Sequence, residues 1–189
     1  EAGLDAAALE IGLGGRLDAV NLIDGDAAIL TSVDLDHMDF LGPTREHIGA
    51  EKAWIFRAGC PAILAEPNPP ASVIAHAQAI GTALLRVHLA GASPAGDWSL
   101  PLPDGQRLTL PAPGLPGPSQ RRNAAAAVLA LWALRSRWRY ASAALAAGIA
   151  GARAGGRLER LPRVAEGWVD VAHNAESARE LAAWLSQQP

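Results

Sequence analysis

The chain has 189 residues, half of them hydrophobic, with a net charge of −3 and one cysteine. Its length and apolar content suffice for a buried core in one or two domains, and the charge gives no electrostatic case for nucleic acid or an anionic membrane. The longest apolar run, residues 124–134, is too short to span a bilayer, and no signal peptide is visible. Because the single Cys60 also suits a reducing compartment, we expect a cytoplasmic monomer whose partners are small molecules.

The first half of the chain alternates short apolar runs with helical patterns. Buried strands are predicted at residues 6–11, 27–33, 61–65 and 83–88. Helices are predicted from Thr44 to Arg57, with Gly59 as the stop, and over residues 70–80, with Gly81 as the stop. Strands that alternate with helices predict an α/β fold whose mostly parallel sheet is flanked by helices on both faces.

The second half begins with turn-rich sequence and ends with helices. In order, we expect a loop at 91–96, a hairpin over 98–110 that turns at Asp104-Gly105, a Pro/Gly-rich connector at 111–118, and helices at 123–135 and 141–149. The small residues 151–156 predict a boundary between two domains, 1–153 and 154–189. The second domain is predicted to start with a hairpin over 158–171 that turns at Glu166-Gly167, followed by a helix over 174–187.

Lys52 stands out because it is the only lysine beside fifteen arginines. It falls on the apolar stripe of its predicted helix, together with Ile48, Ile55 and Phe56. A buried lysine can become neutral and nucleophilic, which arginine cannot. The alternative is a lysine whose stem is buried while its amine reaches water.

Two further residues suggest a metal site. Glu10 is a carboxylate at the end of an apolar run, and a buried carboxylate must be paired or bind a cation; an ion pair with Arg16 is the alternative. His37, between Asp36 and Asp39, follows another predicted strand and is either a metal ligand or a capped loop histidine. The glycines after Glu10 fit a dinucleotide-binding fingerprint poorly, because Leu17 replaces its third glycine.

Polar residues also mark two later segments. Asn123, three residues after Gln120, is either a helix N-cap or an amide that contacts a nucleotide. Arg157 can hold a phosphate bidentately. Asp170 can bind ribose hydroxyls or help to cap the helix that follows it.

The order of these motifs resembles the folylpolyglutamate synthase/dihydrofolate synthase branch of the Mur ligase family. The resemblance rests on LEIGLGGRLDAVN (9–21), TSVDLDHMDFLGPTREHIGAEKAWIF (31–56), the Gln-x-x-Asn helix start, GGRLERL (155–161) and DVAHN (170–174). It implies part of a central ATPase domain followed by the start of a C-terminal α/β domain. It also implies a ligase of folate biosynthesis that phosphorylates the carboxylate of dihydropteroate or a reduced folate with ATP and then joins it to L-glutamate.

The resemblance also implies roles for single residues. Glu10 and His37 match magnesium ligands, although a histidine ligand leaves room for manganese. Lys52 matches a lysine that carbon dioxide carbamylates, a reaction that needs a neutral amine. The remaining matches are residues that contact ATP: Gln120, Asn123, Arg157, Asp170 and His173.

The chain also departs from the family pattern. Trp54 replaces a glycine, and Gly155 stands where the family often has proline. No Gly-Lys-Ser phosphate loop is present, because the single lysine precedes Ala53. We therefore expect an internal fragment that is inactive as a ligase on its own. A peptidoglycan-precursor ligase is the enzymatic alternative, disfavoured by the run GLGGRLDAVN, and a truncated, non-catalytic product is the other.

Overall fold

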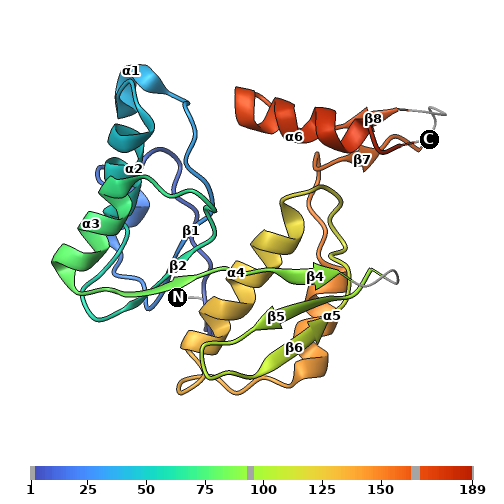
Figure 1. The fold of residues 1–189 in the computed structure, drawn as a ribbon, viewed down its shortest axis with the longest axis horizontal. Helices are drawn as coiled ribbons and strands as arrows, with labels where there is room; N and C mark the ends of the chain where they lie inside the picture. The colour runs from blue at the N-terminus through green and yellow to red at the C-terminus, as the bar shows by residue number, and fades with distance from the viewer. Residues whose placement is uncertain (1–2, 93–95, 163–166, 189) are drawn as a thin grey trace.

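The computed structural model describes residues 3–92, 96–162 and 167–188 (Figure 1). The elements are, in chain order, a 3-10 turn η1 (Ala19–Leu22), β1 (Ala28–Leu30), α1 (Met38–Leu41), α2 (Arg45–Ala53), β2 (Pro61–Leu64), α3 (Ala71–Ile80), β3 (Ala83–Arg86), β4 (Ala90–Ala92), β5 (Trp98–Pro101), β6 (Arg107–Leu110), α4 (Gln120–Ala133), α5 (Ser142–Gly151), β7 (Glu159–Arg160), β8 (Trp168–Val169) and α6 (Ala175–Leu185). None of the helices in these described ranges is long and apolar enough to cross a membrane.

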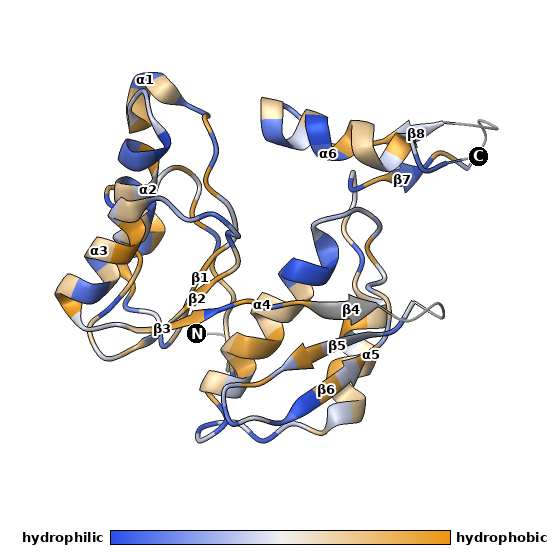
Figure 2. Ribbon diagram, in the orientation of Figure 1, coloured by the Kyte–Doolittle hydropathy of each residue, from blue (hydrophilic) through white to orange (hydrophobic). Residues whose placement is uncertain are grey.

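The predicted parallel sheet is present and has the order β1-β2-β3. Successive side chains of a strand point to opposite faces. Accordingly, Ile63 of the central strand packs into the cluster that contains α4, whereas Leu64 packs into the cluster that contains α2 and α3. Figure 2 shows apolar residues on β1, β2 and the helices that cover them. The expectation of an α/β sheet covered on both faces is therefore confirmed.

The fully buried Ile63 gives a direct test of this two-sided core. We expect Ile63→Ala to lower the free energy of unfolding by about 2–5 kcal/mol, because it leaves a cavity beneath α4. Ile29, on the neighbouring edge strand, is 37% exposed, so Ile29→Ala should cost clearly less. Urea denaturation of both variants measures the difference, and equal losses would contradict this description of the core.

A second, antiparallel sheet has the order β4-β5-β6 and packs on α4 and α5. Its β5–β6 hairpin turns at Asp104-Gly105 as predicted, with Gly105 at φ +86. Trp98 is 2% exposed and donates its indole N–H to the carbonyl of Pro111, at 2.8 Å. The predicted loop at 91–96 is partly replaced by β4, and residues 93–95 lie outside the described ranges.

Helix boundaries follow local capping signals. Thr44 caps α2 by accepting a hydrogen bond from the amide of His47, and Gly81 ends α3 in the left-handed conformation. The prediction that the first of these helices continues to Arg57 is wrong, because α2 ends at Ala53. The guanidinium of Arg57 instead binds the carbonyls of Trp54 and Phe56, which favours a turn there.

The predicted strand at residues 6–11 is wrong. These residues form no regular element and pair with none of the described strands, and residues 6–10 are exposed. An apolar run becomes a strand only where a neighbouring strand satisfies its backbone hydrogen bonds. The predicted strand at 27–33 is also shorter than expected, since β1 stops at Leu30.

The last segment forms a small unit of its own. β7 pairs with β8 in the predicted hairpin, while the predicted turn at Glu166-Gly167 lies partly outside the described residues. Asn174 and Ser177 form a capping box at the start of α6. The rings of Trp168 and Trp184 meet edge to face, with centroids 4.7 Å apart.

Candidate functional site

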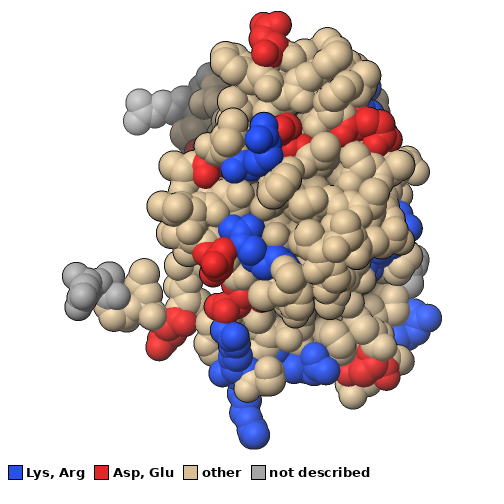
Figure 3. All heavy atoms as spheres, turned by 90° about the vertical axis from the view of Figure 1, so that its left-hand side faces the viewer, with Lys and Arg blue, Asp and Glu red and all other residues tan. Residues whose placement is uncertain are grey.

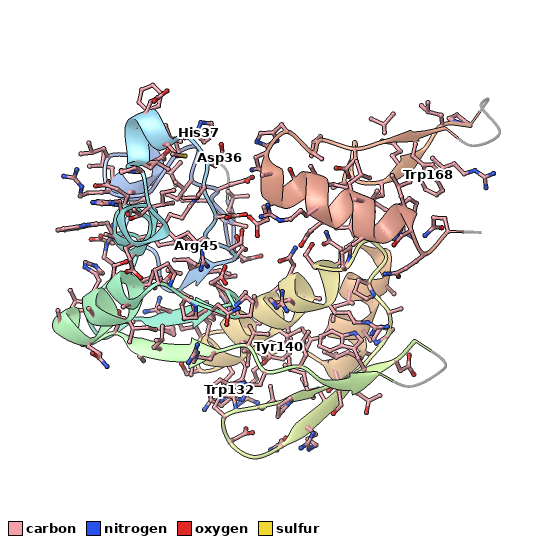
Figure 4. All side chains as sticks on the ribbon, turned by 45° about the horizontal axis from the view of Figure 1, so that its top comes forward. Asp36, His37, Arg45, Trp132, Tyr140 and Trp168 are labelled. Atoms are coloured by element: carbon pink, nitrogen blue, oxygen red, sulfur yellow. The ribbon has the colours of Figure 1, made fainter. Side chains whose placement is uncertain are left out.

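The acidic loop, residues 33–37, leads from β1 to α1 and carries the predicted metal ligand His37. His37 has the left-handed conformation (φ +48), which is uncommon for a residue other than glycine. Asp36 stabilises this turn by accepting a hydrogen bond from the amide of His37 at 2.8 Å. Figure 4 shows Asp36 and His37 side by side on the part of the loop that faces α6.

Helix α6 contacts this loop from the other end of the chain. The side-chain amide of Asn174 donates to Asp36 at 2.7 Å, and the hydroxyl of Ser32 donates to Glu176 at 3.2 Å. Arg179 forms an ion pair with Asp34. The hydrogen bond from Asn174 is the main reason why the pKa of Asp36 lies below its ordinary value. We call these three pairs the α6 contact.

Lys52 lies half-buried near the end of α2. Burial lowers the pKa of its amine, although the carboxylates of Asp36 and Glu176 act in the opposite direction. Burial also raises the pKa of Glu176. The carboxylates of Asp36 in the acidic loop and of Glu176 in α6 thus both act on this amine, and the placement of Lys52 at the metal site stays a prediction.

Because Lys52 is the only lysine, its titration can be followed without ambiguity. We expect Glu176→Gln to lower the pKa of Lys52 further, since the substitution removes a negative charge that favours the ammonium form. Glu180→Gln, one helical turn later in α6, is the matched control. NMR titration with 13C-labelled lysine measures both, and an unchanged pKa in Glu176→Gln would disprove the electrostatic contact.

The two predicted metal ligands differ in their surroundings. Glu10 is exposed in the unpaired segment before the glycine motif, so it does not end a strand as expected. Its alternative partner, Arg16, instead binds Glu51 at 2.9 Å. The imidazole Nε2 of His37 lies 3.7 Å from the carboxylate of Asp36. Among the described residues, no three His, Cys, Asp or Glu side chains form a group that could hold a metal ion.

The glycine motif after Glu10 packs against the end of α2. A side chain at Gly15 would approach the carbonyl of Glu51 to 2.7 Å and that of Lys52 to 3.0 Å, so only glycine fits there. The amide of Arg16 donates to the carbonyl of Glu51 at 3.1 Å. The motif thus contacts the helix end that carries Lys52. Gly15 is therefore explained by the close approach of its backbone to α2, and a bound nucleotide is not needed to explain it.

A cleft of about 350 Å³ lies between the start of α4 and the segment that leads to α6. Gln120, Asn123, Arg157 and Asp170 all line it, together with Ser177 and Glu180 of α6. Four of the five residues predicted to contact ATP are therefore brought together, whereas His173 is not among the lining residues. Gly117 and Gly156 permit the turns at this cleft with φ values of +118 and +68.

The structure decides between some of the simpler alternatives for these residues. Asn123 is not the N-cap of α4, because the helix starts at Gln120 with Ser119 before it. Instead, its amide lies 3.4 Å from the side-chain oxygen of Gln120. Asp170 does not cap α6 either, since Asn174 does so. The carboxylate of Asp170 accepts hydrogen bonds from the amides of Leu158 and Ala172, at 3.0 and 2.8 Å.

His173 is exposed and lies between the cleft and the α6 contact. Its Nδ1 is 2.8 Å from the carbonyl of Val171, so Nδ1 carries the proton. Its charge, when present, is one of the smaller causes that lower the pKa of Asp36, after the hydrogen bond from Asn174. Residues 170–174 thus connect the two sites.

Sequence reasoning missed Glu66 and Arg45, which hold the start of the acidic loop. Glu66 follows the apolar strand β2, so it carries the same signal that drew attention to Glu10: a carboxylate at the end of an apolar run. It also missed Glu176, for which no local signal exists.

On the face shown in Figure 3, acidic and basic side chains are interspersed over a largely uncharged surface.

Curated relatives match the chain over nearly all of its length. It is 41% identical to dihydrofolate synthase/folylpolyglutamate synthase of Escherichia coli (strain K12), covering 100% of this chain and 44% of that protein. The protein of the same name from Bacillus subtilis is 33% identical, covering 98% and 45%. The chain thus spans less than half of the length of these relatives. No protein-family model matches it.

Solved structures show the same fold. "E.coli FolC in complex with DHPP and ADP" aligns with a TM-score of 0.85 and 40% identity, covering 95% of this chain and 42% of that one. A bifunctional folylpolyglutamate synthase/dihydrofolate synthase with Mn, AMPPNP and L-glutamate bound aligns with a TM-score of 0.80 and 37% identity, covering 94% and 42%. The α/β fold with its parallel sheet is therefore the fold of these ligases.

Proposed function

Because this chain is a homologue of the dihydrofolate synthase/folylpolyglutamate synthases, we propose that it is part of an ATP-dependent ligase of folate biosynthesis. The ligase joins L-glutamate to dihydropteroate, to tetrahydrofolate, or to both. The carboxylate of the pterin substrate takes the γ-phosphoryl group of ATP, and the glutamate amine then attacks the acyl carbon and displaces phosphate. The curated relatives described above act in folate metabolism by name, which disfavours a peptidoglycan-precursor ligase.

The observation that carries the nucleotide site is the cleft between α4 and residues 154–181. We propose that Gln120, Asn123, Arg157 and Asp170 bind ATP there, with Arg157 supplying positive charge for a phosphate. Related structures contain ADP or AMPPNP. His173 belongs to this proposal through its neighbours only, since it lies beside the cleft rather than in its wall.

We further propose that Glu10 and His37 bind a divalent cation beside the acidic loop. One carboxylate oxygen and one imidazole nitrogen suit Mn²⁺ at least as well as Mg²⁺. Both side chains are exposed, so an ion that is coordinated by further ligands can reach them. A related structure contains Mn. Such an ion, when bound, neutralises phosphate charge.

Lys52 is proposed to be carbamylated in the complete enzyme, as the resemblance implies. Its lowered pKa supports this proposal, because carbon dioxide reacts only with the neutral amine. Trp54, the departure from the family pattern beside it, packs its ring against His76 of α3 with centroids 5.1 Å apart. This contact directs the large ring toward α3.

We retain the division into residues 1–153 and 154–189 as a proposal, as well as the cytoplasmic, monomeric state. The division is supported by the end of α5 at Gly151 and by the separate hairpin that follows. Size-exclusion chromatography with light scattering tests the monomer. Independent folding of residues 1–153 tests the boundary.

The activity itself is tested by glutamate-dependent phosphate release from ATP, with dihydropteroate or tetrahydrofolate as acceptor. The 189-residue chain and a protein with the full length of its relatives are compared side by side. We expect turnover only from the longer protein, because the shorter chain contains no Gly-Lys-Ser loop to hold the γ-phosphate. Activity with a peptidoglycan precursor in place of the folates would refute the folate assignment.

A further inference from the structure

Glu66 is the one buried charged residue in the described part of the chain, with 7% of its surface exposed. A buried carboxylate is costly unless hydrogen bonds and an opposite charge compensate it. Glu66 accepts the amides of Val33 and Asn68, each at 2.9 Å. Glu66 also forms an ion pair with the guanidinium of Arg45, 3.3 Å away. One of these bonds anchors the first residue of the acidic loop.

Arg45, the first residue of α2, holds the same point from the other side. Its Nε donates to the carbonyl of Val33 at 2.8 Å, and a terminal nitrogen donates to the carbonyl of Asn68 at 2.9 Å. The N–H and the C=O of Val33 are therefore both bound by charged side chains, and its own side chain is 2% exposed in the core. Such charge-assisted hydrogen bonds are the stronger kind.

The residues that follow Val33 carry the polar groups of the site. Asp34 and Asp36 take part in the α6 contact, and His37 follows in its left-handed conformation. A strained conformation of this kind persists only where the surroundings determine it fully. At the far end, α1 begins directly after His37, whose carbonyl accepts the amides of Phe40 and Leu41. At the near end, Glu66 and Arg45 supply the constraint.

We propose that Glu66 and Arg45 are positioning residues. They act through Val33 to hold the acidic loop, so that His37 and Asp36 face the site of the proposed divalent cation. Neither residue lines the nucleotide cleft. The proposal rests on the proposed function, in which His37 binds a divalent cation. The competing explanation is that this pair merely stabilises the core between β2 and α2, with no influence on the loop.

A matched control exists one residue along α2. Glu46 also accepts two backbone amides, those of Ala71 and Ser72 at 3.0 and 2.8 Å, but it joins α2 to α3 rather than to the loop. Glu66→Gln and Glu46→Gln each replace one of two amide-accepting oxygens by an NH2 group and remove the negative charge, at a buried site in the first case and an exposed site in the second. Only the first removes an anchor of Val33. Arg45→Lys, at a side chain that is 40% exposed, is a milder second variant for the same anchor.

Hydrogen exchange of residues 33–37 in the 189-residue chain measures the loop directly. We expect Glu66→Gln and Arg45→Lys to speed this exchange by about tenfold or more, whereas Glu46→Gln leaves it near the wild-type rate. Calorimetric titration with Mn²⁺ alone should show weaker binding in the first two variants only. If Glu66→Gln does not fold, Arg45→Lys carries the test.

Equal exchange in Glu66→Gln and Glu46→Gln would overturn the proposal. So would an unchanged Mn²⁺ affinity in a variant whose loop exchanges faster. If the wild-type chain binds no Mn²⁺, the assignment of His37 as a metal ligand in this chain fails instead. The exchange data then still decide whether Glu66 and Arg45 hold the loop.

Discussion

Replacing Lys52 by alanine in the complete enzyme is expected to reduce ligase turnover by about a hundredfold to a thousandfold, the usual cost of losing one group that stabilises developing charge. The amine is half-buried, and the carboxylates of Asp36 and Glu176 act on it electrostatically. In the proposed mechanism its carbamate helps to organise the cation and the phosphate. Steady-state phosphate release measures the loss.

Lys52→Arg separates the carbamate from a simple positive charge. Arginine keeps the charge but cannot form the carbamate, so we expect this variant to be as inactive as Lys52→Ala. Bicarbonate or a short carboxylate should restore part of the activity of Lys52→Ala only. Glu51→Gln is the matched control on the same helix, because its ion pair with Arg16 lies at the surface and contributes little. Full activity of Lys52→Arg would refute the carbamate.

The charges around Lys52 add a condition to this prediction. The ammonium form is attracted by Asp36 and Glu176, whereas a carbamate would place a third negative charge beside them. Carbamylation is therefore favourable only if a cation offsets that charge. We expect the 13C signal of the carbamate, formed from labelled carbon dioxide, to require Mn²⁺ or Mg²⁺ and to disappear when a chelator removes the ion.

The elements that sequence reasoning located well have their own boundary signals. Helix α3 lies between Pro70 and Gly81, and the β5–β6 hairpin turns at Gly105, so each was predicted within one or two residues. Residues 6–11 are also mostly apolar, but no described strand pairs with them, so the strand predicted there is wrong. Apolar content indicates burial, whereas pairing depends on residues far away in the sequence.

The same distinction holds for the site. Local pattern was enough to single out Lys52, His37 and the residues that line the cleft. It could not indicate that Asn174 would bind Asp36, which lies 138 residues earlier. Glu66 was overlooked for a different reason. It carries the same local signal as Glu10, a carboxylate after an apolar run, and only the structure shows which of the two is buried.

Arg157→Ala is expected to weaken the binding of ADP by about tenfold to a hundredfold, because hydrogen bonds to a charged phosphate contribute roughly 1.5–3 kcal/mol. Arg157 lines the cleft together with Asn123, and it is exposed, so the substitution should leave the free energy of unfolding nearly unchanged. Calorimetric titration of ADP into the 189-residue chain measures the affinity, since base and ribose contacts do not require a phosphate loop.

Arg153→Ala tests whether any nearby positive charge would have the same effect. Arg153 is also exposed, four residues earlier, but its guanidinium binds the carbonyls of Ala150 and Ala152 and is not among the groups that line the cleft. Its loss should change ADP affinity by less than about twofold, in line with a screened surface charge. The affinity lost in Arg157→Ala should also shrink with adenosine as the ligand, because adenosine carries no phosphate for the arginine to hold. Equal losses for ADP and adenosine would mean that Arg157 shapes the cleft and does not bind phosphate.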